Sequence, residues 1–179
     1  MLDESEEDGK DGLFARDRGE EPMESVTLAI ALEREHREID GGIEAYAAGL
    51  ANGLSDTEPL LRAMNGLRRH IYLEEEFLFP PLRAGGMMVQ LFVMVREHGE
   101  LWKTMEALDA SLAAGAASDV LLPACATLLA QLDKHNSKEE PIIYPQADTV
   151  LTDEAAAQLS SFLDSGTMPE GWVCQKARA

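Results

Sequence analysis

Apolar residues recur at helical spacing along most of this chain, beginning close to Glu24. In the first such segment, Leu28, Leu32 and Ile39 fall on one face of a helix. Breaks rich in Gly, Ser and Ala separate this segment from three others, and no alternating pattern typical of strands competes with them. The pattern predicts four long helices, over about residues 24–50, 55–82, 87–112 and 119–146.

The expected helix ends and the short connections between the helices predict how the helices are arranged. Ser55, with Glu58 three residues later, is typical of a capping box and predicts the start of the second helix. Thr152 is a typical N-cap residue and predicts a short fifth helix over "DEAAAQLSSFLD". Because short connections join the long helices, neighbouring helices should run antiparallel. The sequence therefore predicts an all-α fold, an up-down-up-down four-helix bundle with a short C-terminal fifth helix.

The chain is strongly acidic, with a formal net charge of -18, and its acidic residues are densest at the N-terminus. We expect residues 1–23 to form a flexible acidic tail, residues 24–147 the bundle, and residues 148–179 a short helix and C-terminal tail. Trp172, in the last segment, is expected to pack on the bundle. So acidic a chain is poorly suited to nucleic acid or to an anionic membrane, and we expect neither as a partner.

The cysteines and the apolar runs indicate in which cellular compartment the protein is expected. Cys125 and Cys174 lie far apart and match neither a disulfide framework nor the spacing of metal ligands. The longest apolar run, residues 87–95, is too short to cross a bilayer, and the N-terminus lacks the apolar stretch of a signal peptide. These features favour a soluble cytoplasmic protein that is a monomer or a weak dimer.

One sequence phrase occurs twice, as "HIYLEEEFLFPPL" from His70 and as "HNSKEEPIIYP" from His135. In both copies a His is followed at i+4 by a Glu, which is Glu74 or Glu139. A second Glu, apolar residues, an aromatic residue and a Pro come next. Residues four apart share one face of a helix, so each His and its Glu should point in the same direction.

The four histidines are distributed one to each predicted long helix. In an up-down bundle, two residues lie at one height when they are equidistant from the turn that joins their helices. The midpoints between successive histidines fall at positions 53, 84 and 116.5, and each midpoint lies in a predicted turn. With a rise of about 1.5 Å per residue, small errors in the turns shift a level by only a few ångströms. The imidazoles of His36, His70, His98 and His135 are therefore predicted to share one layer.

The two repeated glutamates complete a candidate metal site. The second and fourth helices run in the same direction, so Glu74 and Glu139 should lie about 6 Å to the same side of the histidine layer. Two glutamates buried together repel or neutralise unless a cation lies between them. Four imidazoles and two carboxylates in an apolar core predict a site for one or two divalent transition metals. The predicted metal ligands are His36, His70, Glu74, His98, His135 and Glu139, and no catalytic residue is assigned.

These residues resemble the hemerythrin-like, HHE cation-binding domain. The resemblance covers roughly residues 25–147 and rests on the doubled His–Glu phrase, on His36 in "EREHREID" and on His98 in "VREHGELW". It implies a non-haem di-iron centre, with two iron ions joined by oxo or hydroxo bridges and by Glu74 and Glu139. The histidines would be terminal ligands, and zinc or manganese is a possible occupant of purified protein. The family implies O2, NO or peroxide as the small-molecule partner.

The chain departs from the oxygen carriers of the family at one position. Those carriers have a fifth histidine four residues from another on the third helix, whereas His98 is flanked at that spacing by Met94 and Trp102. Glu33, three residues before His36, is an alternative oxygen ligand, with a solvated surface carboxylate as the competing interpretation. The missing imidazole favours peroxide or NO chemistry, or sensing, over simple oxygen carriage.

Two functions therefore remain open. The first is a di-iron protein that binds, senses or reacts with O2, NO or peroxide. The alternative is a non-catalytic, metal-responsive or structural interaction module with a zinc or manganese di-metal site. The sequence does not decide whether the protein is an enzyme. Tyr72 and Tyr144 are expected at the boundary of the bundle rather than in its chemistry.

Overall fold

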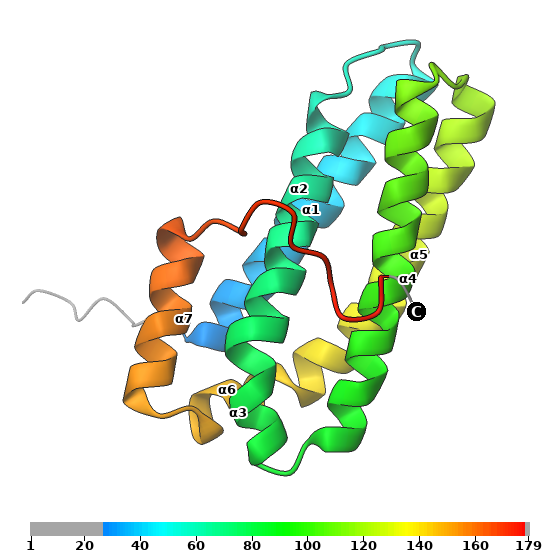
Figure 1. Cartoon of the computed structure of the whole chain (residues 1–179). Coiled ribbons are helices and arrows are strands. Elements are labelled where there is room, and N and C mark those ends of the chain that lie inside the picture. The colour runs from blue at the N-terminus through cyan, green and yellow to red at the C-terminus, as the bar shows by residue number, and fades with distance from the viewer. Residues whose placement is uncertain (1–26, 178–179) are drawn as a thin grey trace, which may run out of the picture.

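Four long helices pack side by side with alternating direction (Figure 1). They are α1 (Leu28–Ala51), α2 (Glu58–Leu73), α4 (Met88–Ala113) and α5 (Ser118–Ile142). The computed structural model describes residues 27–177, so the predicted acidic tail of residues 1–23 lies outside the described residues. The all-α, up-down-up-down bundle is confirmed, and so is the short C-terminal helix α7 (Asp153–Ser165).

The second helix continues past Leu73, but not as a regular α-helix. A π-helical turn, Glu74–Leu78, connects α2 to α3 (Phe79–Ala84). Within this turn the amide of Phe79 donates to the carbonyl of Glu74, five residues earlier. Pro80 has no amide hydrogen to continue the regular ladder, which favours this wider turn. The turn buries two consecutive carboxylates, Glu74 and Glu75.

The last long helix is also interrupted. It was predicted to run to about residue 146, but α5 ends at Ile142 and α6 (Tyr144–Val150) continues in a different direction across the end of the bundle (Figure 1). Pro141 and Pro145 lie on either side of this break, where each removes a backbone donor. The change of direction points Tyr144 into the interior, where it is fully buried.

Two of the predicted helix starts have different outcomes. Thr152 caps α7 as predicted, because its hydroxyl accepts a 3.3 Å hydrogen bond from the amide of Ala155. The capping box at Ser55 is wrong: α2 begins at Glu58 after Thr57, and the carboxylate of Asp56 accepts from the Glu58 amide at 3.0 Å. The Asp56 side chain competes locally for the amide that Ser55 was expected to approach.

The buried side chains form two apolar clusters, one toward each end of the bundle. The cluster nearer the α1–α2 turn includes Leu60, Met105 and Leu128, and the other includes Leu32, Phe79 and Leu91. The buried histidines and glutamates belong to neither cluster, although their helices contribute to both. The polar residues are therefore enclosed by apolar packing on both sides.

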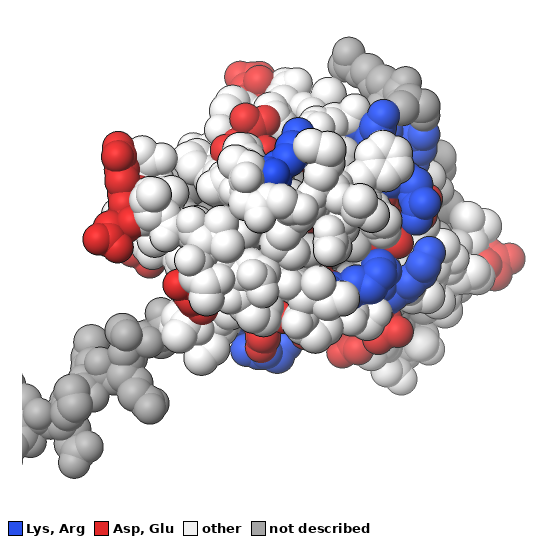
Figure 2. Space-filling model, turned by 90° about the horizontal axis from the view of Figure 1, so that it is seen from below, with Lys and Arg blue, Asp and Glu red and all other residues white. Residues whose placement is uncertain are grey.

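The end of the molecule near α3 and α6 differs from the acidic chain as a whole. Seen from this end, charged side chains lie mainly around the margin and the centre is largely uncharged (Figure 2). Exposed Met88, Val89 and Phe92 lie in the first turns of α4. In residues 27–177, no helix has both the length and the apolar character that a bilayer crossing requires.

The C-terminal segment crosses α2 and ends beside α4 (Figure 1). Trp172 packs edge-on against Tyr72 and Trp102 and donates to Glu76 at 3.1 Å, so the predicted packing of Trp172 on the bundle is observed. At Gly99 the segment approaches α4 so closely that an added Cβ would lie 2.6 Å from the carbonyl oxygen of Lys176.

Gly99→Ala is therefore expected to lower the free energy of unfolding by about 1–3 kcal/mol, because the backbone around Lys176 must move away. Gly41→Ala is the matched control. Gly41 also lies within a helix, but nothing lies within 4 Å of an added Cβ there. This variant should gain about 0.5–1 kcal/mol. Urea unfolding measures both changes, and a similar gain at Gly99 would contradict the close contact.

Candidate metal centre

The structure brings all six predicted site residues together. His36, His70, His98 and His135 come from α1, α2, α4 and α5, and none is more than 3% exposed. Glu74 lies in the π-helical turn and Glu139 near the end of α5, and both are fully buried. The layer of imidazoles expected from the positions of the turns is present.

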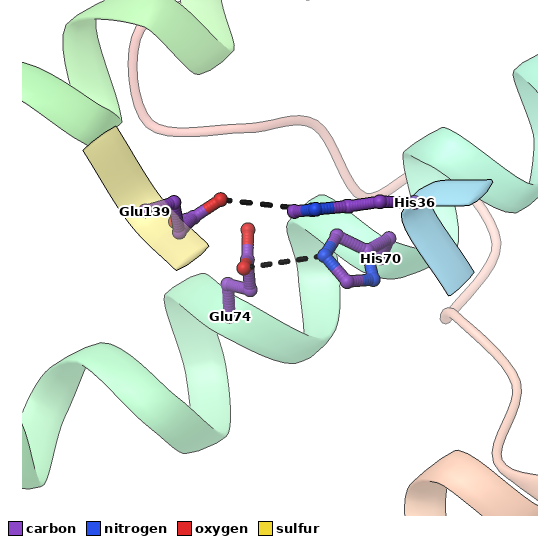
Figure 3. A group of neighbouring side chains, drawn as sticks. All are labelled: His36, His70, Glu74 and Glu139. Atoms are coloured by element: carbon purple, nitrogen blue, oxygen red, sulfur yellow. Dashed lines mark ion pairs between the residues drawn. The ribbon is translucent and has the colours of Figure 1, made fainter. Parts of the chain in front are cut away.

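The donor atoms form two groups that share both carboxylates. In each group, one donor atom per residue lies within 4.8 Å of all the others. The first group, drawn in Figure 3, pairs His36 and His70 with Glu74 and Glu139. The second pairs His98 and His135 with the same two glutamates.

The inward nitrogen of each imidazole, Nε2, faces the shared carboxylates. Glu74 reaches one histidine of each group, with Oε1 3.2 Å from His70 and Oε2 3.2 Å from His98. Oε2 of Glu139 lies 2.9 Å from Nε2 of His135 and 3.7 Å from Nε2 of His36. Each carboxylate is therefore placed between the two groups.

The outward nitrogen of each imidazole, Nδ1, contacts a further glutamate on an adjacent segment of the bundle. These four hydrogen bonds are 2.8–3.2 Å long. Such an outer carboxylate fixes the orientation of a metal-binding imidazole and makes it a stronger base. The pairs are Glu35 with His70, Glu75 with His98, Glu97 with His135, and Glu140 with His36.

These four outer glutamates were not predicted from the sequence, although each is next to a predicted ligand in the chain. Glu35 and Glu97 directly precede His36 and His98, and Glu75 and Glu140 directly follow Glu74 and Glu139. The repeated "REH" and "HxxxEE" phrases were the available signal. Each outer glutamate serves a histidine of another helix, so spacing within one helix does not reveal the pairing.

The buried carboxylates raise the pKa of three of the imidazoles. Burial alone would lower the pKa of His70 and of His135, but their neighbouring glutamates raise both to about 10. The pKa of His98 is also raised, against the effect of burial, by Glu74 and Glu75. Burial and the proximity of His70 instead lower the pKa of His36. Protons on His70 and His135 thus supply positive charge among the glutamates, and a bound cation would displace them.

The donor set fits a metal ion in the second group. Within residues 27–177, Oε1 of Glu139 is buried without a hydrogen-bond partner, and Oε2 of Glu74 and Nε2 of His98 form an ion pair at 3.2 Å but no hydrogen bond. A buried polar atom without a partner costs about 1–3 kcal/mol. Imidazole nitrogens and carboxylate oxygens that converge in this way are a donor set suited to a divalent transition metal.

A further polar atom, the hydroxyl oxygen of Tyr144, lies within the first group. Tyr144 was expected at the boundary of the bundle, but it is fully buried and its hydroxyl lies among the ligands. The hydroxyl oxygen is 2.8 Å from Nε2 of His36 and 3.0 Å from Nε2 of His70. It donates to Oε1 of Glu74 at 2.8 Å and lies 3.4 Å from Oε2 of Glu139.

Glu33 does not replace the fifth histidine. Its side chain is 34% exposed, pairs with Arg37 at 3.6 Å, and belongs to neither group of donor atoms. Met94 and Trp102, at the positions flanking His98, are buried, and the indole of Trp102 donates to Glu106. Phe79 stacks on His98 with ring centroids 5.4 Å apart. The second group is therefore bordered by apolar and aromatic side chains.

A helical bundle with two interlocked clusters of His and Glu defines a class of metal-binding protein. The family model described as Hemerythrin HHE cation binding domain matches residues 27–147. The chain belongs to this family, and the resemblance noted from the sequence is confirmed. Comparisons with curated proteins and with solved structures returned no match.

Removal of one outer carboxylate should weaken metal binding even though no ligand is lost. Glu140→Ala is expected to reduce affinity about 10- to 100-fold, because Nδ1 of His36 loses its 2.9 Å partner. Glu38→Ala is the control, since Glu38 is exposed on α1, pairs with Arg34 at 3.9 Å and belongs to neither group of donor atoms. Competition titrations with a chelator measure both affinities. Equal affinities would contradict a positioning role for Glu140.

Asp40 lies outside both groups and gives the fold a dependence on pH. Burial raises the pKa of Asp40 to about 6, and three neighbouring carboxylates add to the effect. Between about pH 4 and pH 6 the folded chain keeps a proton that the unfolded chain has lost, so stability falls as pH rises through this range. Above about pH 6, Asp40 is ionised in the folded and the unfolded chain, and the folded state remains destabilised by its buried charge.

Asp40→Asn is accordingly expected to stabilise the protein at pH 7.5 by about 1 kcal/mol, a figure discounted for the partial exposure of the group. At pH 4 the difference should nearly vanish, because Asp40 is then largely protonated in the folded state. Urea unfolding of the metal-free protein at both values of pH measures the effect. If Asp40→Asn changes the free energy of unfolding equally at pH 4 and at pH 7.5, ionisation of Asp40 is not the cause.

Proposed function

We propose that this protein holds a non-haem di-iron centre that binds, senses or reacts with O2, NO or peroxide. The observation that carries the proposal is the sharing of two buried carboxylates between two pairs of imidazoles. Membership of a cation-binding family supports a metal at this position. The assignment of iron goes further, and it rests on the donor set and on the resemblance to di-iron members of the family.

The residues have distinct roles in this proposal. His36 and His70 hold one ion, His98 and His135 hold the other, and each histidine is oriented by its outer glutamate. Glu74 and Glu139 bind between the two positions. Their negative charges, buried side by side, are compensated by two cations more completely than by one. Neither group includes Cys125 or Cys174, so the donor set lacks the thiolates common in closed zinc sites.

The enclosure of the site favours a very small ligand. All six proposed metal ligands are at most 3% exposed. The fully buried ring of Phe79 stacks on His98 and covers this part of the second group. A di-iron pair supplies redox chemistry and coordination positions for a small oxidant. The protein restricts access to molecules of about the size of O2, NO or peroxide and holds the histidines in fixed orientations.

The same enclosure also favours a second candidate function, in which zinc or manganese stabilises the bundle and no small molecule reacts. Apolar side chains occupy the place of a fifth imidazole, and three of the donor atoms have no hydrogen bond within residues 27–177. A metal that binds only the folded state stabilises it by mass action. A large rise in Tm with zinc or manganese, without a spectral response of the iron-loaded protein to O2, NO or peroxide, distinguishes this function from the first.

The central test is metal content after expression with iron. Close to two irons per chain are expected in the unmodified protein, measured by elemental analysis against protein concentration. Glu74→Ala and Glu139→Ala should each lose at least one iron, because each carboxylate belongs to both groups. Glu33→Ala is the matched control and should keep both irons, since Glu33 lies outside the groups. Two irons retained in both carboxylate variants would contradict the shared assignment.

A further inference from the structure

We propose that the phenol oxygen of Tyr144 is a fifth protein ligand of the metal ion held by His36 and His70. This inference rests on the proposed metal centre and adds a residue that neither the family match nor the His and Glu clusters assign. It makes the two halves of the centre chemically different. The first half is completed by a tyrosine, and the half with His98 and His135 keeps the coordination positions that a small molecule needs.

The surroundings of the hydroxyl are those of a ligand position. Its oxygen lies 2.8–3.4 Å from four donor atoms, one from each residue of the first group. With metal–ligand distances of about 2.1 Å, adjacent donors around a six-coordinate ion are about 3 Å apart. The Tyr144 oxygen therefore lies about as far from each of these four atoms as one ligand of such an ion lies from its neighbours.

Hydrogen bonding alone does not account for this arrangement. A phenol hydroxyl has one hydrogen and two lone pairs, so three partners satisfy it, whereas this oxygen has four polar neighbours. Tyr144 is also fully buried, and its position depends on the break between α5 and α6 that turns its side chain toward the site. The local fold thus places an oxygen donor against the metal position.

The internal repeat provides a comparison within the chain. Tyr144 lies nine residues after His135, and Phe79 lies nine residues after His70. Both rings are fully buried against the centre, Tyr144 in the first group and Phe79 stacked on His98 in the second. The two copies of the phrase therefore present equivalent aromatic rings, of which one carries an oxygen donor.

Coordination by Tyr144 replaces the bond between its oxygen and hydrogen with a bond to the metal ion. The phenol proton, now donated to Glu74, is released to solvent, and no oxidation or reduction is involved. Phenolate oxygen is an established ligand of ferric iron in proteins. Burial and the charges of Glu139 and Glu74 raise the pKa of Tyr144 well above its usual range, so a cation is needed to stabilise the phenolate.

The test uses the full-length protein loaded with ferric iron. A phenolate bound to ferric iron gives a visible charge-transfer band and enhanced tyrosine ring vibrations in the resonance Raman spectrum. Tyr144→Phe should abolish both signals and weaken the binding of one iron by roughly tenfold. Tyr46→Phe and Tyr72→Phe are matched controls that alter the two other tyrosines of the chain and should keep both signals.

A second measurement does not depend on the folding of a variant. Protein that contains ring-deuterated tyrosine, without any substitution, should show shifted ring vibrations under the charge-transfer band. Unmodified protein that holds two irons but lacks these signals, or a Tyr144→Phe variant that retains them, would overturn the assignment of Tyr144 alone. A chain that takes up no metal would overturn both this inference and the proposed function.

Discussion

The charges of Glu74 and Glu139, buried together in an apolar core, constrain the rest of the structure. Two carboxylates removed from water need compensating positive charge, which protons on His70 and His135 or bound cations can supply. The raised pKa values of His70 and His135 express this compensation in the metal-free chain. The apolar clusters on either side keep water away, which strengthens the demand for an internal partner.

The four outer glutamates form hydrogen bonds to the histidines that together make a ring around the bundle. Each connects one helical segment to the next, from α1 to α2, from the turn after α2 to α4, from α4 to α5, and from α5 back to α1. Two members of the ring extend outward. Glu35 also binds Arg69, whose guanidinium donates to the last carbonyls of α7, and Glu75 accepts from the amide of Gln175. The C-terminal segment is thereby connected to the orientation of two imidazoles.

Prediction from the sequence succeeded where the answer depended on regular helix geometry. The height of each histidine follows from a constant rise per residue and from the positions of the turns, so the layer was predictable. The outer pairs were not, because adjacent residues on a helix point about 100° apart and Glu35 finds its partner on another helix. Tyr144 was misplaced because a regular helix was extended through Ile143, where the structure breaks the helix and turns the ring inward.

The repeated His–Glu phrase gives two nearly equivalent groups of donor atoms, but the two metal positions that they define need not be equivalent. Both halves have two imidazoles, both share the same carboxylates, and both place an aromatic ring nine residues after a histidine. The difference is concentrated in one oxygen atom, on Tyr144, and in the absence of its counterpart on Phe79. Met94 and Trp102, the buried residues four positions before and after His98, belong to neither group of His and Glu donors found within residues 27–177. In the proposed centre, one half would have a fifth protein donor in Tyr144, and the other half would keep a free coordination position for a small molecule. The two metal positions would therefore differ chemically although each has the same His and Glu donor set.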